Sequence, residues 1–475
     1  MENLVDQAAT GFLLISEPSE AQVRVEPGGE VRIAEWVYAL VAPFPTVEDG
    51  MSYESLRALW SGEAQEGKRI FLTADVFEVM SNVLGSPSSS WVQLTAPEDL
   101  LDLTWEESPA YAIVPFEDLE PRWKVLALDV QSPIRKDFDR EAYPLIASFG
   151  ISGDPEAAEQ LRAALDTQFS NYDPNKLTTL VMTGVTALTR ATAWRMETHG
   201  IGYPAELIGE WLQEADLAHV SNEGPVVSDC PEPDPSQEKL KFCSDPGYIQ
   251  LLVDLGIDLV ELTGNHVWDY GSDNLVFTLA LYRQNGMEYF GGGEDLDDAF
   301  HAVRVEHNGN RLAFLGCNQI GPKYAWAGDE KPGAAPCDWD RLREEIRILR
   351  EEGYLPIFTF QWAELTATNP AQEEAFRDAV DAGAVIVSGS QAHQPLGFAF
   401  HHGGFIHFGL GNLFFDQMQL AELRQEFIDR HVFYDGRHIS TELLTAMLEN
   451  YAQPRPMSLD ERSVLLERIF AESGW

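Results

Sequence analysis

The sequence is poor in cations and has no long hydrophobic run. Its 475 residues hold 32 Lys and Arg against 77 Asp and Glu, which gives a formal net charge of −45. A charge of this sign repels nucleic acid and anionic membrane surfaces, so we expect no nucleic-acid partner. No apolar stretch reaches the roughly 18 residues that a membrane-spanning helix needs. An anionic substrate would therefore have to be held by a local cation or a metal ion.

The chain also lacks the pattern of a secretory signal peptide near its start. Residues 1–22 carry acids where a signal peptide has Lys or Arg, and no apolar segment there leads to a cleavage site. Two interpretations stay open: the chain is cytoplasmic, or its reading frame begins downstream of an export signal.

Cysteine is rare, and the four that occur fall into two local pairs. Cys230 and Cys243 lie in one loop rich in Pro and Asp, and Cys317 and Cys337 lie in a second loop. Neither pair has the Cys-x-x-Cys spacing of zinc or redox sites. We expect two loop-closing disulfides, with four reduced thiols as the alternative. Disulfides favour an extracytoplasmic or cell-envelope location, even though no signal peptide is visible.

Secondary-structure signals divide the chain into four parts. Residues 1–150 alternate short strands with capped amphipathic helices, one of which ends at Gly62. We predict a linker over residues 151–176 and longer strand–helix units over residues 177–420. Residues 421–475 are predicted to form a C-terminal helical extension. The pattern as a whole predicts an α/β protein of two domains, the first smaller than the second.

Polar side chains gather where the predicted strands of residues 177–420 end. In α/β sheets the loops that follow the strand ends converge and form a site. His can exchange protons near neutral pH, and Asn and Glu offer oxygen ligands. The residues concerned are Asn222 and Glu223 after "LAHVS", Asn265, His266 and Asp269 after "VELTG", Gln361 and Glu364 after "LPIFTF", Gln391 and His393 after "IVSGS", and Asn412 and Asp416 in "FGLGNLFFD".

Three stretches carry a resemblance to a known family. They are "ELTGNHVWDYGSDNLVFTLALYRQNGMEYFGGG", "DAGAVIVSGSQAHQP" and "GGFIHFGLGNLFFDQ". Residues 177–417, which contain them, resemble the CapA family of poly-γ-glutamate capsule biosynthesis proteins, whose domain is related to the calcineurin-like metallophosphoesterases. The resemblance implies an α/β/β/α sandwich of two sheets for this part of the chain.

Part of residues 1–150 has a resemblance of its own. The stretches "YALVAPFPTVEDGMSYESLRALWSG" and "AIVPFEDLEPRWKVLALD" are similar to one lobe of a phosphate-type periplasmic solute-binding protein. The alternative is an α/β domain that serves as a scaffold without a ligand.

The CapA resemblance implies roles for single residues. In such sites the Asn of the Asn-His pair ligates a metal and the His donates a proton to the leaving group, roles that would fall to Asn265 and His266. Glu223 corresponds to the family's acid after the second strand, and His393 to the second His of a Gly-His-x-His element. Arg190 matches an Arg of the first motif and could meet an anionic group.

Three expected metal ligands are replaced. Val185 stands where the family has Asp, Gln361 where it has a His, and Gln391 where it has the first His of Gly-His-x-His. Amides bind transition metals far more weakly than imidazole does, and valine binds none. A two-metal centre is therefore not expected. Either one divalent ion, Mn, Zn or Ca, is held by Glu223, Asn265 and His393, or the pocket is metal-free and hydrogen-bonds amides, sugars or a polyglutamate backbone.

The resemblance implies a role in making or processing an extracellular anionic polymer of the poly-γ-glutamate type. The polymer or its precursor would be the partner, together with other capsule-synthesis membrane proteins. If the chain is a hydrolase acting on amide bonds, we expect His266, Glu223 and Asp269 to be catalytic. Two alternatives stay open: a non-catalytic envelope protein that binds ligand, and a metal-dependent phosphoesterase. Residues expected to bind substrate are Asn222, Arg190, Gln361, Glu364, Gln391 and Asn412.

Overall fold

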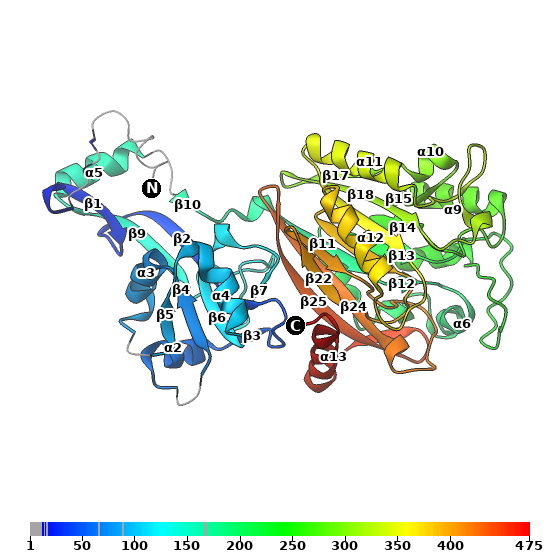
Figure 1. Cartoon of the computed structure of the whole chain (residues 1–475), viewed down its shortest axis with the longest axis horizontal. Helices are drawn as coiled ribbons and strands as arrows, with labels where there is room; N and C mark the ends of the chain where they lie inside the picture. Colours follow the sequence, from blue (N-terminus) through cyan, green and yellow to red (C-terminus); the bar gives the residue numbers. More distant parts are fainter. Residues whose placement is uncertain (1–11, 14, 16–17, 65–66, 88–89, 166–168) are drawn as a thin grey trace. The chain divides into compact units, whose positions relative to one another are not determined.

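The computed structural model describes residues 12–13, 15, 18–64, 67–87, 90–165 and 169–475. The chain forms two compact units, Met1–Asn175 and Lys176–Trp475, and each is described by itself. Figure 1 shows their elements. Among the described residues, no helix combines the length and the apolar character needed to cross a bilayer.

The first unit is built on a mixed sheet with the strand order β1-β9-β2-β6-β4-β5, in which β7 and β10 also pair with β2. Its strands are β1 (Val23–Pro27), β2 (Val31–Pro43), β3 (Gly50–Met51), β4 (Arg69–Leu72), β5 (Val92–Leu94), β6 (Ala110–Pro115), β7 (Trp123–Val125), β8 (Ala127–Leu128), β9 (Ile146–Gly153) and β10 (Phe169–Ser170). Its helices and turns are η1 (Pro18–Glu20), α2 (Tyr53–Ser61), α3 (Ala74–Leu84), η2 (Pro97–Asp99), α4 (Leu100–Glu106), η3 (Phe116–Asp118) and α5 (Pro155–Ala164).

Local signals set the ends of α2. The Ser52 side chain accepts a hydrogen bond from the backbone N–H of Ser55, which satisfies one of the free donors at the helix start. Gly62 follows the last helical residue with φ 80°, a left-handed conformation that glycine adopts without steric cost. The predicted helix end at Gly62 is confirmed.

The predicted linker over residues 151–176 is wrong. β9 runs to Gly153 and pairs antiparallel with both β1 and β2, and β10 adds a parallel pair to β2. Between them, α5 packs Ala158 and Leu161 onto Ile33 and Ile151 of the sheet. The segment therefore belongs to the first unit, because its apolar residues cover one end of that sheet.

The second unit has two sheets that face each other. The larger sheet has the order β15-β14-β13-β11-β24-β25-β26, with β12 beside β13, and the smaller has the order β17-β18-β20-β21-β23-β22. Its strands are β11 (Leu177–Thr183), β12 (Val185–Thr186), β13 (Leu217–Asn222), β14 (Leu259–Glu261), β15 (Glu288–Phe290), β16 (Gly292–Gly293), β17 (Val303–His307), β18 (Asn310–Asn318), β19 (Gly333–Ala334), β20 (Leu355–Gln361), β21 (Ile386–Ser390), β22 (Phe398–His401), β23 (Gly404–His407), β24 (Gln425–Tyr434), β25 (Arg437–Glu449) and β26 (Gln453–Pro456).

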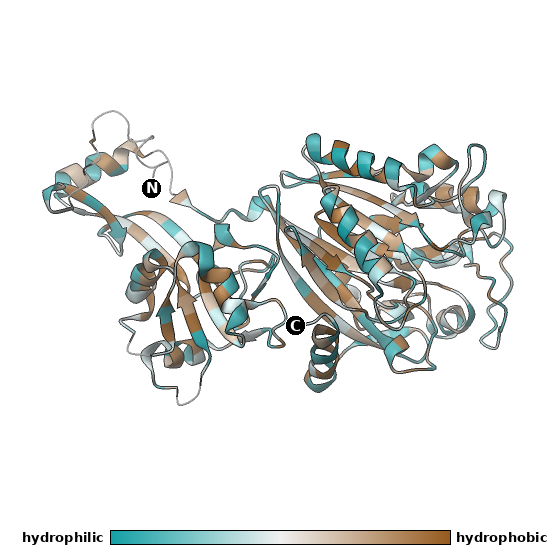
Figure 2. Cartoon of the chain, viewed as in Figure 1, coloured by the Kyte–Doolittle hydropathy of each residue, from teal (hydrophilic) through white to brown (hydrophobic). Residues whose placement is uncertain are grey.

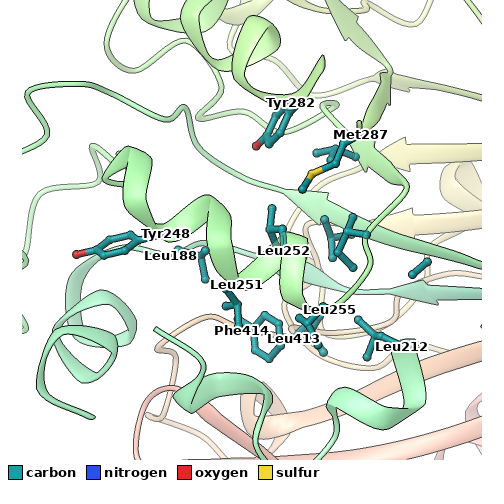
Figure 3. Packing of buried hydrophobic residues seen from close by; sticks show 14 of the residues in the cluster. Leu188, Leu212, Tyr248, Leu251, Leu252, Leu255, Tyr282, Met287, Leu413 and Phe414 are labelled. Carbon is teal, nitrogen blue, oxygen red and sulfur yellow. The ribbon is translucent and has the colours of Figure 1, made fainter. Parts of the chain in front are cut away.

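Helices cover the outer face of each sheet. Leu251 and Leu252 of α8 belong to a buried apolar cluster on the larger sheet (Figure 3). The same cluster contains Leu279 of α9 and strand residues such as Val220. On the smaller sheet, α11 and α12 pack their apolar sides onto β20 and β21, while their polar sides face outward (Figure 2). The helices and turns are η4 (Pro174–Lys176), α6 (Arg190–His199), η5 (Tyr203–Ala205), α7 (Gly209–Gln213), η6 (Pro246–Tyr248), α8 (Ile249–Asp254), α9 (Ser272–Gln284), α10 (Leu296–Ala299), η7 (Lys323–Ala325), α11 (Trp339–Glu351), α12 (Pro370–Asp381), η8 (Glu422–Arg424) and α13 (Leu459–Glu472).

The inner faces of the two sheets meet in a buried layer. Phe290 of β15 lies 5.9 Å from Phe314 of β18, measured between ring centroids. His407 Nδ1 of β23 lies 2.6 Å from the carboxylate of Asp429 in β24. The order helix, sheet, sheet, helix confirms the predicted α/β/β/α sandwich.

The predicted helical extension over residues 421–475 is wrong. Three strands, β24, β25 and β26, occupy most of it, and β24 pairs antiparallel with β11 in the larger sheet. Only α13 is an α-helix among the described residues there. The hairpin signal Asp435-Gly436, with φ values of 51° and 73°, joins β24 to β25 in a two-residue turn. Polar residues such as Asp429 and His431 are buried between the sheets, and this burial hides the strand pattern.

Both predicted disulfides are confirmed. Cys230 is bonded to Cys243, and Cys317 at the end of β18 is bonded to Cys337 just before α11. The second pair spans 20 residues of sequence. Each bond therefore closes a loop whose freedom would otherwise favour the unfolded chain.

Removing the second disulfide should weaken the fold. We expect the double variant Cys317→Ala, Cys337→Ala to lose about 3 kcal/mol of unfolding free energy, because the unfolded chain regains the entropy of an open loop. Urea unfolding of oxidised wild type and variant measures the difference. Dithiothreitol should shift the wild-type transition and leave that of a variant lacking all four cysteines unchanged. A loss below about 1 kcal/mol would contradict this expectation.

Candidate functional site

The predicted site residues lie at the carboxyl ends of parallel strands, where the loops converge. Asn222 ends β13, and the Asn265-His266 pair follows β14, which pairs in parallel with β13. Gln361 ends β20, which pairs in parallel with β21, and Gln391 follows β21 directly. β13 and β14 belong to the larger sheet and β20 and β21 to the smaller, and a hydrogen bond from Gln361 Nε2 to Asn265 Oδ1 links the two sets of loops.

His266 is held in a fixed orientation. Its Nδ1 lies 2.8 Å from Asp269 Oδ2, and the same carboxylate oxygen accepts a hydrogen bond from the backbone N–H of Phe242. The Phe242 ring packs on the imidazole with centroids 4.2 Å apart. With Nδ1–H committed to Asp269, His266 presents Nε2 for chemistry.

Electrostatics favour the charged form of His266. Burial lowers its pKa, but the hydrogen bond to Asp269 and the charges of Glu223 and Asp269 outweigh burial and raise it above the ordinary value. Its side chain is 15 % exposed and that of Asp269 is 6 % exposed. The His266–Asp269 pair can therefore hold a proton in an environment that is largely shielded from solvent.

His393 is oriented in the same manner by an amide. Its Nδ1 lies 2.8 Å from Asn412 Oδ1, and the Asn412 NH₂ donates to the carbonyl oxygens of His393 and Leu423. Because the NH₂ group of Asn412 donates to these carbonyl oxygens, Asn412 Oδ1 faces His393 and accepts a hydrogen bond from it. His393 therefore carries its proton on Nδ1 and keeps a lone pair on Nε2. Burial is the main cause that lowers the pKa of His393, which keeps the ring neutral.

Glu223 is a buried carboxyl that interacts electrostatically with His266. Its side chain is 1 % exposed, and burial raises its pKa to about 7. The charge of His266 opposes this shift, whereas Glu364 and Asp269 add to it. A carboxyl of this kind exchanges protons near neutral pH.

Side-chain amides line the site in a hydrogen-bonded chain. Gln361 Nε2 donates to the side-chain oxygens of Asn265 and Gln391, and Gln391 Nε2 donates to Glu364 at 3.1 Å. Gln391 and His393 both have positive φ, at 82° and 56°. Such strained non-glycine conformations concentrate at functional loops.

Arg190 forms a buried ion pair with Asp416. The guanidinium contacts the Asp416 carboxylate, whose second oxygen accepts from the backbone N–H of Ala191 at 2.9 Å. Arg190 also lies over the rings of Phe242 and Phe415, 4.8 and 5.1 Å from their centroids. The positive charge of Arg190 is therefore largely neutralised by Asp416 in the absence of a ligand.

Asn222 is turned toward its own loop. Its side-chain NH₂ donates to the carbonyl oxygen of Gly224 at 2.6 Å, and the residue is buried. A cavity of about 70 Å³ lies beside the Cys230–Cys243 disulfide. Of the predicted substrate-binding residues, among those the structure describes, only Arg190 lines it. Its wall carries Glu197, Glu232, Asp234 and Asp245 against Arg190 and Lys241, so the cavity repels an anionic polymer.

The residues present do not fit a two-metal centre. Val185 is fully buried and packs with Ala187, Phe242 and Phe415, so an apolar cluster fills the place of the missing carboxylate. Within the described part of the chain, no three His, Cys, Asp or Glu ligand atoms at this edge lie within 4.8 Å of one another. One divalent ion at Glu223, Asn265 and His393 stays a prediction, to which His393 would contribute its free Nε2.

The comparison with known families decides the assignment. Residues 179–417 match the model of the family described as "Bacterial capsule synthesis protein PGA_cap". The chain belongs to this family. The predicted resemblance to CapA proteins is thereby confirmed.

Relatives of this PGA_cap chain include named capsule proteins. The capsule biosynthesis protein CapA of Bacillus anthracis is 24% identical over 297 residues, which cover 61% of this chain and 72% of that protein. The PGA biosynthesis protein CapA of Bacillus subtilis (strain 168) is 26% identical over 172 residues, 36% of this chain and 45% of the relative. The structure of a 5'-nucleotidase precursor from Thermus thermophilus shares 12% identity over 62% of this chain and 59% of that chain, with a TM-score of 0.36.

Phe242 was not predicted to lie near this site, and Phe415 was expected to belong to the core. Phe242 stacks on His266, and Phe415 lies 5.3 Å from His393 between ring centroids. The available signal was position: Phe242 precedes Cys243 of a predicted disulfide, and Phe415 precedes Asp416 in a strand-end loop. Their rings make the floor between the two imidazoles apolar.

Proposed function

We propose that this PGA_cap protein takes part in the synthesis or processing of an extracellular anionic polymer of the poly-γ-glutamate type, by acting on its amide bonds. Membership of the capsule synthesis family supports the general role. The names of the Bacillus relatives point to the same polymer class. Other capsule-synthesis membrane proteins are the partners expected at the cell envelope. The two disulfides suit an oxidising, extracytoplasmic compartment.

One observation carries the catalytic part of this proposal. Two imidazoles follow strands of the two facing sheets, β14 and β21, and each is fixed through Nδ1 by a second residue: His266 by Asp269 and His393 by Asn412. Fixing one ring nitrogen leaves the other available for proton transfer. Such an arrangement is typical of general acid/base catalysis.

The proposed hydrolysis divides the work between two residues. Water attacks the amide carbonyl and gives its proton to the Glu223 carboxylate. His266 then delivers its proton to the leaving nitrogen, so that the C–N bond breaks and an acid and an amine result. We assign binding of the polymer backbone to the amide groups of Gln361 and Gln391, which hydrogen-bond to each other and to Asn265.

A direct assay tests the proposal. We expect the purified chain, incubated with poly-γ-glutamate, to change the length distribution of the polymer, as followed by gel electrophoresis. New amine termini should appear in proportion to the bonds cut. No change in length and no new amines, with or without added Mn²⁺, Zn²⁺ or Ca²⁺, would contradict amide-bond cleavage.

A second candidate is a non-catalytic ligand-binding protein. The chain of side-chain amides from Asn265 through Gln361 to Gln391 favours it, since paired donors and acceptors recognise amides and sugars without chemistry. Retained polymer binding without turnover in the assay above, measured by calorimetry, would support this role. The metal-dependent phosphoesterase alternative gains nothing from the ligand geometry described.

A further inference from the structure

Three potential metal ligands meet away from the site described above, where α12 ends beside the β22–β23 hairpin. Asp381 is the last residue of α12, His401 ends β22, and His402 follows it in the hairpin turn. His401 Nε2 and His402 Nδ1 lie 2.8 and 2.7 Å from the same oxygen, Asp381 Oδ1. All three ligand atoms lie within 4.8 Å of one another.

We propose that Asp381, His401 and His402 form a surface site for one divalent transition-metal ion of the Zn²⁺ class. Two imidazoles and a carboxylate suit Zn²⁺, Ni²⁺ or Cu²⁺, whereas Mg²⁺ and Ca²⁺ prefer oxygen ligands alone. Ligand atoms of a tetrahedral zinc ion lie about 3.3 Å apart, given bonds of about 2.0–2.1 Å. The two nitrogens therefore need to move only about 0.5 Å from Asp381 Oδ1 to admit the ion.

The local backbone supports a cation at this place. The carbonyl groups at the end of α12 give it a partial negative charge, which attracts positive ions. The side chain of His402 is 74 % exposed and that of Asp381 is 49 % exposed. An ion can therefore enter from solvent, and water can fill the fourth position.

Such an ion would add a direct link between α12 and the β22–β23 hairpin, which already pack through Val380, Ala399 and Ile406. β22 is the edge strand of the smaller sheet, paired only with β23 in its described hydrogen-bonding order. An ion bridging His401 and His402 to Asp381 would tie this edge hairpin to α12. Amide hydrogen exchange over residues 398–407 should then slow when the ion binds.

Zinc binding to the full chain tests the site. We expect wild type to bind one equivalent of Zn²⁺ here in calorimetric titration at pH 7.5, and His402→Ala and Asp381→Asn to weaken this binding by about tenfold or more. The control variant His199→Ala removes an exposed histidine on α6 and should leave the binding unchanged. Excess Mg²⁺ should not compete.

The variant His393→Ala separates this site from the candidate functional site. We expect it to keep the Zn²⁺ equivalent and the slowed exchange over residues 398–407. Zinc binding that survives His402→Ala and Asp381→Asn, or that is lost only with His393→Ala, would overturn the proposal. Absence of zinc binding by wild type would overturn it as well, and none of these results depends on polymer turnover.

Discussion

Replacing His266 by alanine is expected to lower the rate of polymer turnover by about 100-fold or more, because a positioned general acid/base contributes that much. The polymer should still bind, so the loss should appear in kcat, with KM nearly unchanged. Turnover of the amide polymer at several concentrations, measured by amine release, gives both constants. The variant leaves Asp269 hydrogen-bonded to the backbone of Phe242, so the loop should keep its shape.

Two further variants sharpen this experiment. Asp269→Asn keeps His266 but weakens its orientation, and we expect a fall in kcat of about tenfold or more. His199→Ala removes an exposed histidine of α6 and should retain wild-type kcat. If His266→Ala turned over polymer as fast as His199→Ala does, His266 would have no catalytic role.

Replacing Glu426 by glutamine is expected to stabilise the protein at pH 8 by about 3 kcal/mol. Glu426 of β24 is fully buried, neither carboxyl oxygen has a hydrogen-bond partner, and burial raises its pKa well above the ordinary value of 4.5. Below pH 4.5 the carboxyl is neutral in both folded and unfolded chains. As the pH rises above 4.5, the unfolded chain ionises Glu426 and becomes relatively more stable.

The stabilisation gained by Glu426→Gln should depend on pH. The advantage of the glutamine variant should be near zero at pH 4.5 and grow by about 1.4 kcal/mol per pH unit until the folded pKa is reached. Urea unfolding at several pH values between 4.5 and 8 measures it. The exposed acid Glu422 provides the matched control, and Glu422→Gln should change stability little at any pH. An advantage of Glu426→Gln that does not vary with pH would contradict a buried neutral carboxyl.

The buried layer between the sheets explains why the C-terminal strands were not predicted. Asp429 and His431 of β24 and His407 of β23 are all buried there, although such residues usually mark a solvent-exposed face. His431 and His438 have pKa values lowered by burial, as expected of neutral rings inside a core. A sequence pattern built on apolar residues therefore misses strands whose inner face is polar.

Contacts between residues that are distant in sequence could not be predicted either. Arg190 was expected either to meet an anionic group or to form an ion pair, and its ion-pair partner is Asp416, 226 residues away in sequence. The orientation of His393 by Asn412 is likewise a tertiary contact. The local sequence around each residue does not indicate its distant partner. The partner depends on how the two sheets pack against each other.

The sequence by itself determined the family, the two disulfides, the helix end at Gly62 and the placement of the Asn265-His266 pair at a strand end. These follow from short motifs and from local backbone preferences that act over a few residues. Tertiary structure alone decided which site residues are oriented for chemistry, that apolar rings surround Val185, and that residues 421–475 form mainly strands. These outcomes depend on the burial of polar side chains between two sheets, and burial is a property of the packed molecule.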